Sequence, residues 1–399
     1  MGRNNKLSIR NFFLIGGFPT YLLLLYPFFL AFISRQRDLN DVTTIDTSAL
    51  SQIIFSVFAF LVSMLELRSN KTLRVLITKT PVRWFLYYII FCFLSVFWSI
   101  DFNLTLYRAF ENMSFLLLIC ASFSILYNKY KSPSILIYWV LYYAILLILT
   151  GTLKRSLLWG LPLFSIDTLL LEQMNSAPFF FLVLLLPVGW LLKSIIVSIS
   201  IFSLSNTAYL GMLFGSLGIT GIKRNIKIIF ILIFATVTFF ILFYDLTTFL
   251  QNTIFYGKDG VGFEYTSGRD AIYELAINEG MKKPLLGYGF AAGDTYIISA
   301  NFERIIGAHN GFLSAFLGTG IFGLILFIWF FIKTFKLAKS KFLPKKYKTV
   351  FSSSIIFVLI YTFGNPGLGT RVYGSWISST IIIVLISIVY LHFKKIIRK

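Results

Sequence analysis

Residues 308–329 read AHNGFLSAFLGTGIFGLILFIW, and they join a polar stretch to a run that is apolar enough to cross a lipid bilayer. The polar stretch, residues 267–308, is the longest water-compatible part of an otherwise apolar chain. Small residues at the start of the apolar run would let neighbouring helices approach closely in lipid. The junction therefore predicts a membrane helix that begins against a polar loop, and we expect the chemistry to occur in that loop.

The whole chain is too apolar for a soluble protein. Of its 399 residues, 57% are hydrophobic and only 13% are charged, and the mean hydropathy is +0.81. A net charge of +20 would suggest nucleic acid binding in a soluble protein, but here the basic residues gather in short loops between apolar runs, as topology signals do. We therefore expect membrane lipid around the protein and no nucleic acid partner. Cys92 and Cys120 both fall inside apolar segments and indicate no disulfide framework.

The apolar runs predict an all-α polytopic integral membrane protein with about 12 transmembrane helices. Residues 12–33 are too long for the core of a signal peptide, so we expect them to remain as the first span. About nine spans would form a transmembrane bundle over residues 1–244. A large extracytoplasmic catalytic loop with short helices would follow over 245–310, and C-terminal spans over 311–399. The predicted spans are 12–33, 49–67, 84–100, 105–127, 134–152, 177–192, 194–204, 207–222, 226–244, 311–332, 349–363 and 373–391.

The distribution of charge predicts the orientation of these spans. Most of the 36 lysines and arginines fall in alternate loops, whereas nearly all of the 16 acidic residues fall on or near the other side. Basic loops stay in the cytoplasm during insertion. We therefore expect a multi-pass protein with both termini in the cytoplasm and the 245–310 loop on the extracytoplasmic side.

Arg108 is the first candidate for a functional side chain. It follows a tight turn, residues 98–108, and would lie about one helical turn inside the outer membrane surface. An arginine at that depth is costly unless it faces a wet cavity or a partner, which makes it a candidate for substrate binding. Alternatively, its side chain reaches back to the interface or pairs with Glu111 on the same helix face.

The other two outer loops contribute further candidates. Asn175 precedes an apolar run and is either a substrate contact or a helix cap. Ser267 and Asp270 resemble a capping box that opens a helix. Arg269 would then lie in the first turn, where a cation opposes the helix dipole, so it either faces an anionic group or is an ordinary surface arginine. The glycine-rich residues 287–293 are flexible enough for close backbone approach to a ligand.

His309 is one of only two histidines in the chain and precedes the apolar run 312–329. The free amides at the start of that helix would form an anion site. An imidazole there is a credible general base, because its unperturbed pKa lies near neutral pH. The alternative is a histidine that caps the helix or sits in the membrane interface. The other histidine, His392, lies in the basic cytoplasmic tail, and we expect no catalytic role for it.

The spacing around His309 resembles that of a known family. His309-Asn310, nine residues, Gly320, two residues and Gly323 is similar to the signature of the O-antigen ligase and polymerase family of integral membrane glycosyltransferases. The Ser-Gly-Arg that ends at Arg269 and the Pro-x-x-Gly-x-Gly of residues 284–289 stand where that family has its own such elements.

Two further features bear on the branch of that family. Residues 98–108 resemble an element of the exopolysaccharide-polymerase branch. Ligases tend to carry an arginine in a Ser-x-Ser-Arg turn, but residues 203–207 have Asn206 at that position. Arg108 or Arg371 could substitute for the missing guanidinium group.

The resemblance implies a substrate and a reaction. The substrate would be an oligosaccharide on undecaprenyl diphosphate, presented at the outer, periplasmic face of the bacterial cytoplasmic (inner) membrane. The glycan would pass to an acceptor hydroxyl in a metal-independent transfer that needs no cofactor. His309 would take the hydroxyl proton, and Arg269 would serve as the second catalytic residue. The expected contacts to the diphosphate and the glycan are Arg108, Asn310, Asn175, Arg371 and Asn206.

Three functions remain open on these grounds. The first is a polymerase for O-antigen, capsule or exopolysaccharide, which joins lipid-linked repeat units and would work beside a chain-length regulator and a flippase. The second is an O-antigen ligase, which transfers the glycan to the lipid A–core of lipopolysaccharide. The third is a multispanning transporter or lipid-linked-sugar flippase, for which buried mid-membrane charges and repeat symmetry would be typical.

Overall fold

The computed structural model describes residues 17–33, 47–159, 177–185, 206–217, 269–302, 307–365, 367–372 and 374–397. Throughout these ranges the regular structure is helical and there is no strand. The predicted all-α fold is therefore confirmed for the described residues. The predicted spans 194–204 and 226–244 lie outside the described residues, as does Asn175.

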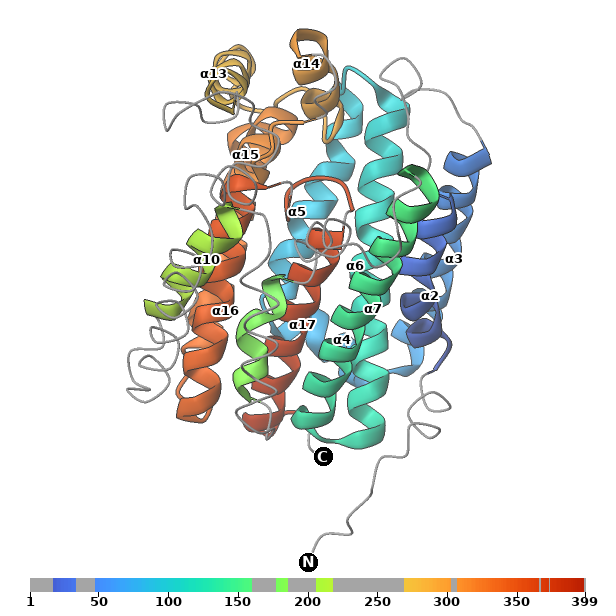
Figure 1. Cartoon of the computed structure of the whole chain (residues 1–399), viewed down its shortest axis with the longest axis vertical. Coiled ribbons are helices and arrows are strands. Elements are labelled where there is room, and N and C mark those ends of the chain that lie inside the picture. The colour runs from blue at the N-terminus through green and yellow to red at the C-terminus, as the bar shows by residue number, and fades with distance from the viewer. Residues whose placement is uncertain are drawn as a thin grey trace, which may run out of the picture.

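The long helices run side by side along the length of the molecule, and two short helices, α13 and α14, lie across one end of them (Figure 1). The end that carries α13 and α14 is called the loop end below. In chain order the helices are α2 (Phe18–Ile33), α3 (Thr47–Ser69), α4 (Lys71–Lys79), α5 (Val82–Leu94), η2 (Ser95–Trp98), α6 (Phe102–Tyr130), α7 (Pro133–Trp159), η3 (Ala177–Leu185), α10 (Asn206–Leu217), α13 (Arg269–Gly280), α14 (Ala292–Asn301), α15 (Gly311–Ala338), α16 (Lys345–Gly364) and α17 (Gly374–Phe393).

Six of the described helices are long and apolar enough to cross a membrane. A seventh candidate is the pair α4 and α5, which are bent by 78° at the break between them. A shorter apolar helix covers Phe18–Phe29. The full number of twelve spans stays a prediction, because part of the chain lies outside the described residues.

Helices α6 and α17 form the interior of the bundle. In each of them, 83% of the most apolar window is buried within the protein, against 22% in α3. Aromatic rings join α5 to its neighbours: Phe85 stacks on Phe330 of α15 at 4.7 Å between centroids, and its ring lies 5.8 Å from that of Trp376 of α17. Such packing matters in lipid, where apolar surface gains little by leaving the solvent. The result is a set of tightly packed helices directly beneath the loop end.

Helix α15 is broken at Gly320, within its N-terminal half. Gly320 has a φ of 65° and a ψ of −165°, which is a conformation that only glycine adopts readily. Because of the break, the N–H of Ile321 donates to the carbonyl of Pro284, with a nitrogen–oxygen distance of 2.8 Å, rather than along the helix. The N–H groups of Tyr288 and Gly289 donate to the carbonyls of Leu317 and Gly318, at 2.9 and 2.8 Å. The 284–289 segment is therefore bonded into the break.

Two glycines make this close contact between backbones possible. Gly287 has a φ of 68°, and a Cβ there would lie 2.6 Å from the carbonyl oxygen of Leu317. A Cβ at Gly320 would collide with the carbonyl group of Leu285. The glycine-rich stretch was expected to approach a ligand. In the structure its close approach is to the backbone of α15.

Replacing Gly320 by alanine should therefore destabilise the protein strongly. The alanine would have to hold a strained backbone, which costs about 1–3 kcal/mol, and its Cβ would push the 284–289 segment out of the break. The measurement is the thermal unfolding midpoint of the detergent-purified protein. The control is Gly17→Ala, where the nearest atoms to the added Cβ belong to side chains, those of Ile125 at 3.1 Å and Pro19 at 3.8 Å. Equal midpoints for the two variants would contradict the account of the break.

Candidate functional site

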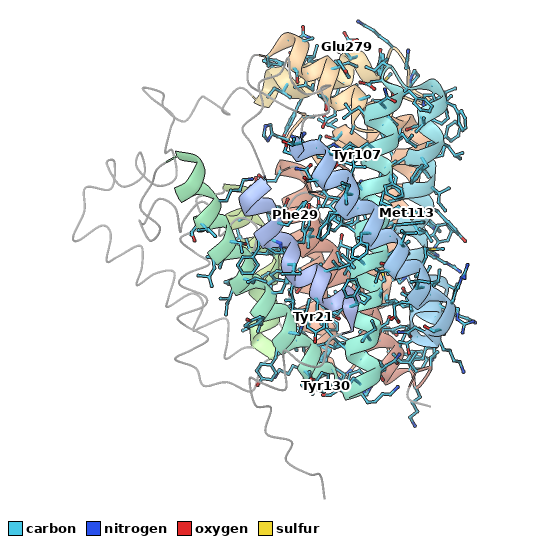
Figure 2. The ribbon with its side chains drawn as sticks, turned by 90° about the vertical axis from the view of Figure 1, so that its right-hand side faces the viewer. Tyr21, Phe29, Tyr107, Met113, Tyr130 and Glu279 are labelled. Atoms are coloured by element: carbon cyan, nitrogen blue, oxygen red, sulfur yellow. The ribbon has the colours of Figure 1, made fainter. Side chains whose placement is uncertain are left out.

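The candidate residues gather at the loop end of the bundle. Figure 2 shows Glu279 of α13 at the top, Tyr107 of α6 below it and Tyr130, at the other end of α6, at the bottom. Arg108 follows Tyr107 directly, so it belongs to the half of α6 that faces α13. Helices α13 and α14 both pack on α15. The structure thus brings the start of α15 and the start of α6 to the same end.

His309 lies on a tight turn that a buried carboxyl group holds in place. The backbone of His309 is left-handed, with a φ of 50°, and Gly307 has a φ of 97°. Histidine is among the few residue types that adopt this conformation with some frequency. Between them, the N–H of Ala308 donates to Oδ1 of Asp294, at 2.7 Å. The side chain of His309 is half-buried.

The carboxyl group that binds this turn belongs to Asp294. It keeps part of its surface exposed, but protein atoms surround its carboxyl group, and this burial raises the pKa of Asp294. The Ala308 N–H and the charge of Arg371 act in the opposite direction and favour the ionised form. Arg371 is therefore close enough to stabilise the carboxylate beside the His309 turn.

The connection between α16 and α17 brings Arg371 to this position. Asn112 of α6 donates from Nδ2 to the carbonyl of Thr370, at 3.1 Å. The hydroxyl of Tyr88 in α5 donates to the carbonyl of Gly369, at 3.2 Å. Two buried side chains, one from α5 and one from α6, thus fix the backbone immediately before Arg371.

Arg108 has a partner on its own helix. Its Nη1 lies 2.9 Å from Oε2 of Glu111, and its guanidinium carbon lies 4.8 Å from the centre of the Tyr107 ring. Both charged side chains are largely buried, with 14% and 4% of their surface exposed. The predicted pairing with Glu111 is therefore present. Arg108 also lies one helical turn before Asn112, so it is near the connection that carries Arg371.

Asn310 is the N-cap of α15. Its Oδ1 accepts hydrogen bonds from the N–H groups of Phe312 and Leu313, at 2.9 and 3.2 Å, and the residue is 7% exposed. The anion site that we expected at this helix start is thus filled in part by the chain itself, because two of the free amides already bind the cap. The cap is Asn310 and not His309, which leaves the imidazole outside that role.

Arg269 is the first residue of α13, and its side chain lies outside the described part of the structure. One turn later, Ile272 belongs to a small buried cluster together with Ala308, the neighbour of His309. The first turn of α13 therefore packs beside the His309 turn. Asn206 begins α10, and its side chain is likewise outside the described residues.

Residues 98–108 donate hydrogen bonds to the 284–289 segment and to Phe290, which follows it. Nε1 of Trp98 donates to the carbonyl of Leu286, at 2.7 Å, and the hydroxyl of Thr105 donates to the carbonyl of Phe290, at 3.0 Å. The N–H of Ile100 donates to the carbonyl of Tyr288, at 3.0 Å. The element that resembles the exopolysaccharide-polymerase branch therefore fastens the loop in the structure.

Sequence reasoning missed Asp294. An acidic residue in the first turn of a short helix is common, because it complements the helix dipole, so nothing in the pattern separates it from other such residues. Its proximity to Ala308 arises only when α14 folds back onto the start of α15. Among the described residues, there is no group of three or more His, Cys, Asp or Glu side chains that could hold a metal ion.

Removing the Asn310 side chain should lower stability. Asn310→Ala leaves two partly buried amides of α15 without their acceptor and should cost about 1 kcal/mol of folding free energy. Asn310→Asp keeps the acceptor oxygen and should retain most of the stability. Denaturation midpoints of the two variants and the wild type check this. If Asn310→Ala were as stable as Asn310→Asp, the capping role would be wrong.

Comparison with known proteins finds a family whose model matches part of the chain. A family model described as O-antigen ligase matches residues 191–328, a segment that contains Arg269, His309 and the break in α15. No curated protein matches the chain. The family implies a glycosyltransferase-like membrane enzyme that acts on a lipid-linked glycan. Residues 191–328 are thus similar to the O-antigen ligase family, and this match supports the resemblance seen in the sequence.

Proposed function

We propose that this protein is a polysaccharide polymerase of the bacterial inner membrane. It transfers a glycan from undecaprenyl diphosphate to a sugar hydroxyl of a second lipid-linked repeat unit. The observation that carries the proposal is the His309 turn, which Asp294 holds at the loop end of the bundle next to the charge of Arg371. An imidazole on a turn whose supporting carboxylate interacts with a guanidinium group suits the transfer of a glycan from a diphosphate.

The proposed reaction needs a base and fixed positive charge. The acceptor oxygen forms a bond to the anomeric carbon while the bond from that carbon to the diphosphate oxygen breaks. His309 takes the hydroxyl proton, which contributes about 10²–10⁴-fold to the rate. The diphosphate leaves with the electron pair, and Arg269 and Arg371 bind its oxygens, because the planar guanidinium group binds phosphate through two hydrogen bonds.

Arg108 would serve the substrate in a different way. Its guanidinium group is paired with Glu111, so its net charge is largely compensated. We assign it to the glycan or to the outer phosphate, together with the free amide nitrogen of Asn310 and the side chains of Asn175 and Asn206.

The distribution of basic residues supports the proposed orientation. Lys71, Arg74 and Lys79 lie on α4, which is in the lower half of Figure 1, whereas α13 and α14 are at the top. Basic residues collect on the cytoplasmic side. The loop end would then face the periplasm, where lipid-linked repeats are presented. A chain-length regulator and a flippase would be natural partners there.

The ligase is the second candidate, because the matching family model is described as O-antigen ligase. Two features favour the polymerase. Asn206 stands where ligases tend to carry an arginine. The 98–108 element, which resembles the exopolysaccharide-polymerase branch, binds the backbone of residues 286–290 directly.

Loss of the base or of the arginine should abolish chain growth. In a strain that lacks the native gene, His309→Ala and Arg269→Ala should each lower the formation of long polymer by at least about 10²-fold. Single repeats should accumulate, as seen on a gel of surface polysaccharide. The matched controls are His392→Ala, whose imidazole binds Tyr127 near the end of α6 away from the loops, and Arg74→Ala, an exposed residue of α4. Normal chain lengths in both test variants would exclude the proposed catalytic roles.

Deletion of the gene should separate the three candidate functions. A polymerase null should leave one repeat or none on the surface acceptor. A ligase null should still build long chains, but these would stay on the lipid carrier. To separate the transporter, purified protein in liposomes without an ion gradient should elongate lipid-linked repeats; failure to do so, with carrier-bound chains absent in the null strain, would favour transport.

A further inference from the structure

We infer that Asp294 is a positioning residue for His309: its carboxyl group holds the Gly307–Ala308 backbone so that the imidazole keeps one place at the loop end. The inference rests on the proposed function in that it assigns a purpose to the placement of His309. It concerns a residue that the family signature does not include.

Both oxygens of the carboxyl group face the turn. Oδ1 accepts the N–H of Ala308, at 2.7 Å. A Cβ on Gly307 would lie 2.6 Å from Oδ2, so the second oxygen covers the α-carbon of Gly307. Asp294 therefore contacts the two residues immediately before His309, and a side chain at Gly307 would displace its carboxyl group.

The turn needs this external support. Gly307 and His309 have φ values of 97° and 50°, and a left-handed non-glycine residue costs about 1–3 kcal/mol unless its surroundings fix it. Ala308 is fully buried, so its N–H has no access to water if the carboxyl group is removed. Leaving a buried donor without an acceptor costs about 1–3 kcal/mol. The turn would therefore rearrange to satisfy the amide, and the imidazole would move with it.

The segment that leads into α14, the helix that carries Asp294, is bonded to η2 and α6. The residue that leads into α14, Phe290, donates its N–H to Oγ of Ser95, at 3.0 Å, and accepts from the hydroxyl of Thr105. The N–H of Gly293 donates to the carbonyl of Gly289, at 3.0 Å. Hydrogen bonds thus connect η2 and α6 to the residues at the start of α14, and Asp294 of that helix binds the His309 turn.

The charge of Asp294 is secondary to its hydrogen-bonding geometry. Burial raises the pKa of its carboxyl group, whereas the Ala308 N–H and the charge of Arg371 favour the ionised form. An asparagine at this position would keep Oδ1 as an acceptor and would remove the need to bury a charge. It should therefore fold well and keep the turn, which makes Asp294→Asn the conservative variant for the test.

The test compares three substitutions at this position with one control. Asp294→Ala removes the acceptor, Asp294→Glu pushes the carboxyl group one carbon further into Gly307, and Asp294→Asn retains the acceptor. The control is Glu279→Gln on α13, which removes a carboxylate from the same end of the molecule but disturbs only its pair with Lys282. Membranes of the deletion strain, in which lipid-linked repeats accumulate, serve as the source of substrate.

The first readout is the rate of chain elongation at varied concentrations of lipid-linked repeat. The Ala and Glu variants should lose about 10²-fold in kcat with little change in KM, because misplacing a catalytic group by about 1 Å has an effect of this size. The Asn variant and the Glu279→Gln control should stay within about threefold of the wild type, well short of that loss.

The second readout does not depend on activity. Diethyl pyrocarbonate labels imidazoles, and mass spectrometry of the purified protein measures the labelling rates of His309 and His392 separately. His309 should label several-fold faster in the Ala and Glu variants, where the turn is released, and at the wild-type rate in the Asn variant. His392 should label equally in all of them.

The outcomes separate the inference from the proposed function. Unchanged labelling of His309 in Asp294→Ala and Asp294→Glu overturns the positioning role, whatever the activity. Failure of Asp294→Asn to fold or to restore elongation also overturns it, since that variant keeps the acceptor atom. If His309→Ala elongates chains normally while Asp294→Ala still alters the labelling of His309, the proposed function is wrong and the positioning role stands.

Discussion

The arrangement of the loop end depends on one interruption of a membrane helix. Where α15 breaks at Gly320, the carbonyls of Leu317 and Gly318 become free to accept hydrogen bonds from the 284–289 segment. In a lipid environment such groups must find partners within the protein, because each unsatisfied one costs several kcal/mol. The break and the segment therefore need each other: without the segment the helix would have unpaired groups, and without the break the segment would have no partner.

This constraint carries over to the candidate site. The segment leads directly into α14, which presents Asp294 to the turn before His309. On the other side, Trp98 of η2 binds the carbonyl of Leu286, and Thr105 of α6 binds that of Phe290. Asn112, which is also in α6, fixes the connection between α16 and α17 that carries Arg371. Side chains from three separate parts of the chain thus reach one end of the bundle through backbone contacts. A polar loop on an apolar bundle gains in this way the rigidity that a site for group transfer needs.

The sequence predicted the fold class and part of the site, for physical reasons that particular residues illustrate. Long apolar runs identify membrane helices, and the pairing of Arg108 with Glu111 follows from their spacing on one helix face. The glycine spacing around His309 pointed to the family whose model matches residues 191–328, but not to the structural reason for the spacing, because backbone bonds between segments about 30 residues apart leave no side-chain pattern. Asp294 was missed for a similar cause: its partner is a backbone amide that only the folded chain brings near. Asn175 and the side chains of Arg269 and Asn206 stay as predictions.

Hydrogen exchange measures the central constraint directly. The peptide that covers residues 284–291 should exchange its amides as slowly as the interior of α15 in the purified, membrane-embedded protein, because the N–H groups of Tyr288 and Gly289 are bonded to that helix. Exchange at the rate of an unprotected loop would contradict the account, since the segment would then not be bonded into the break.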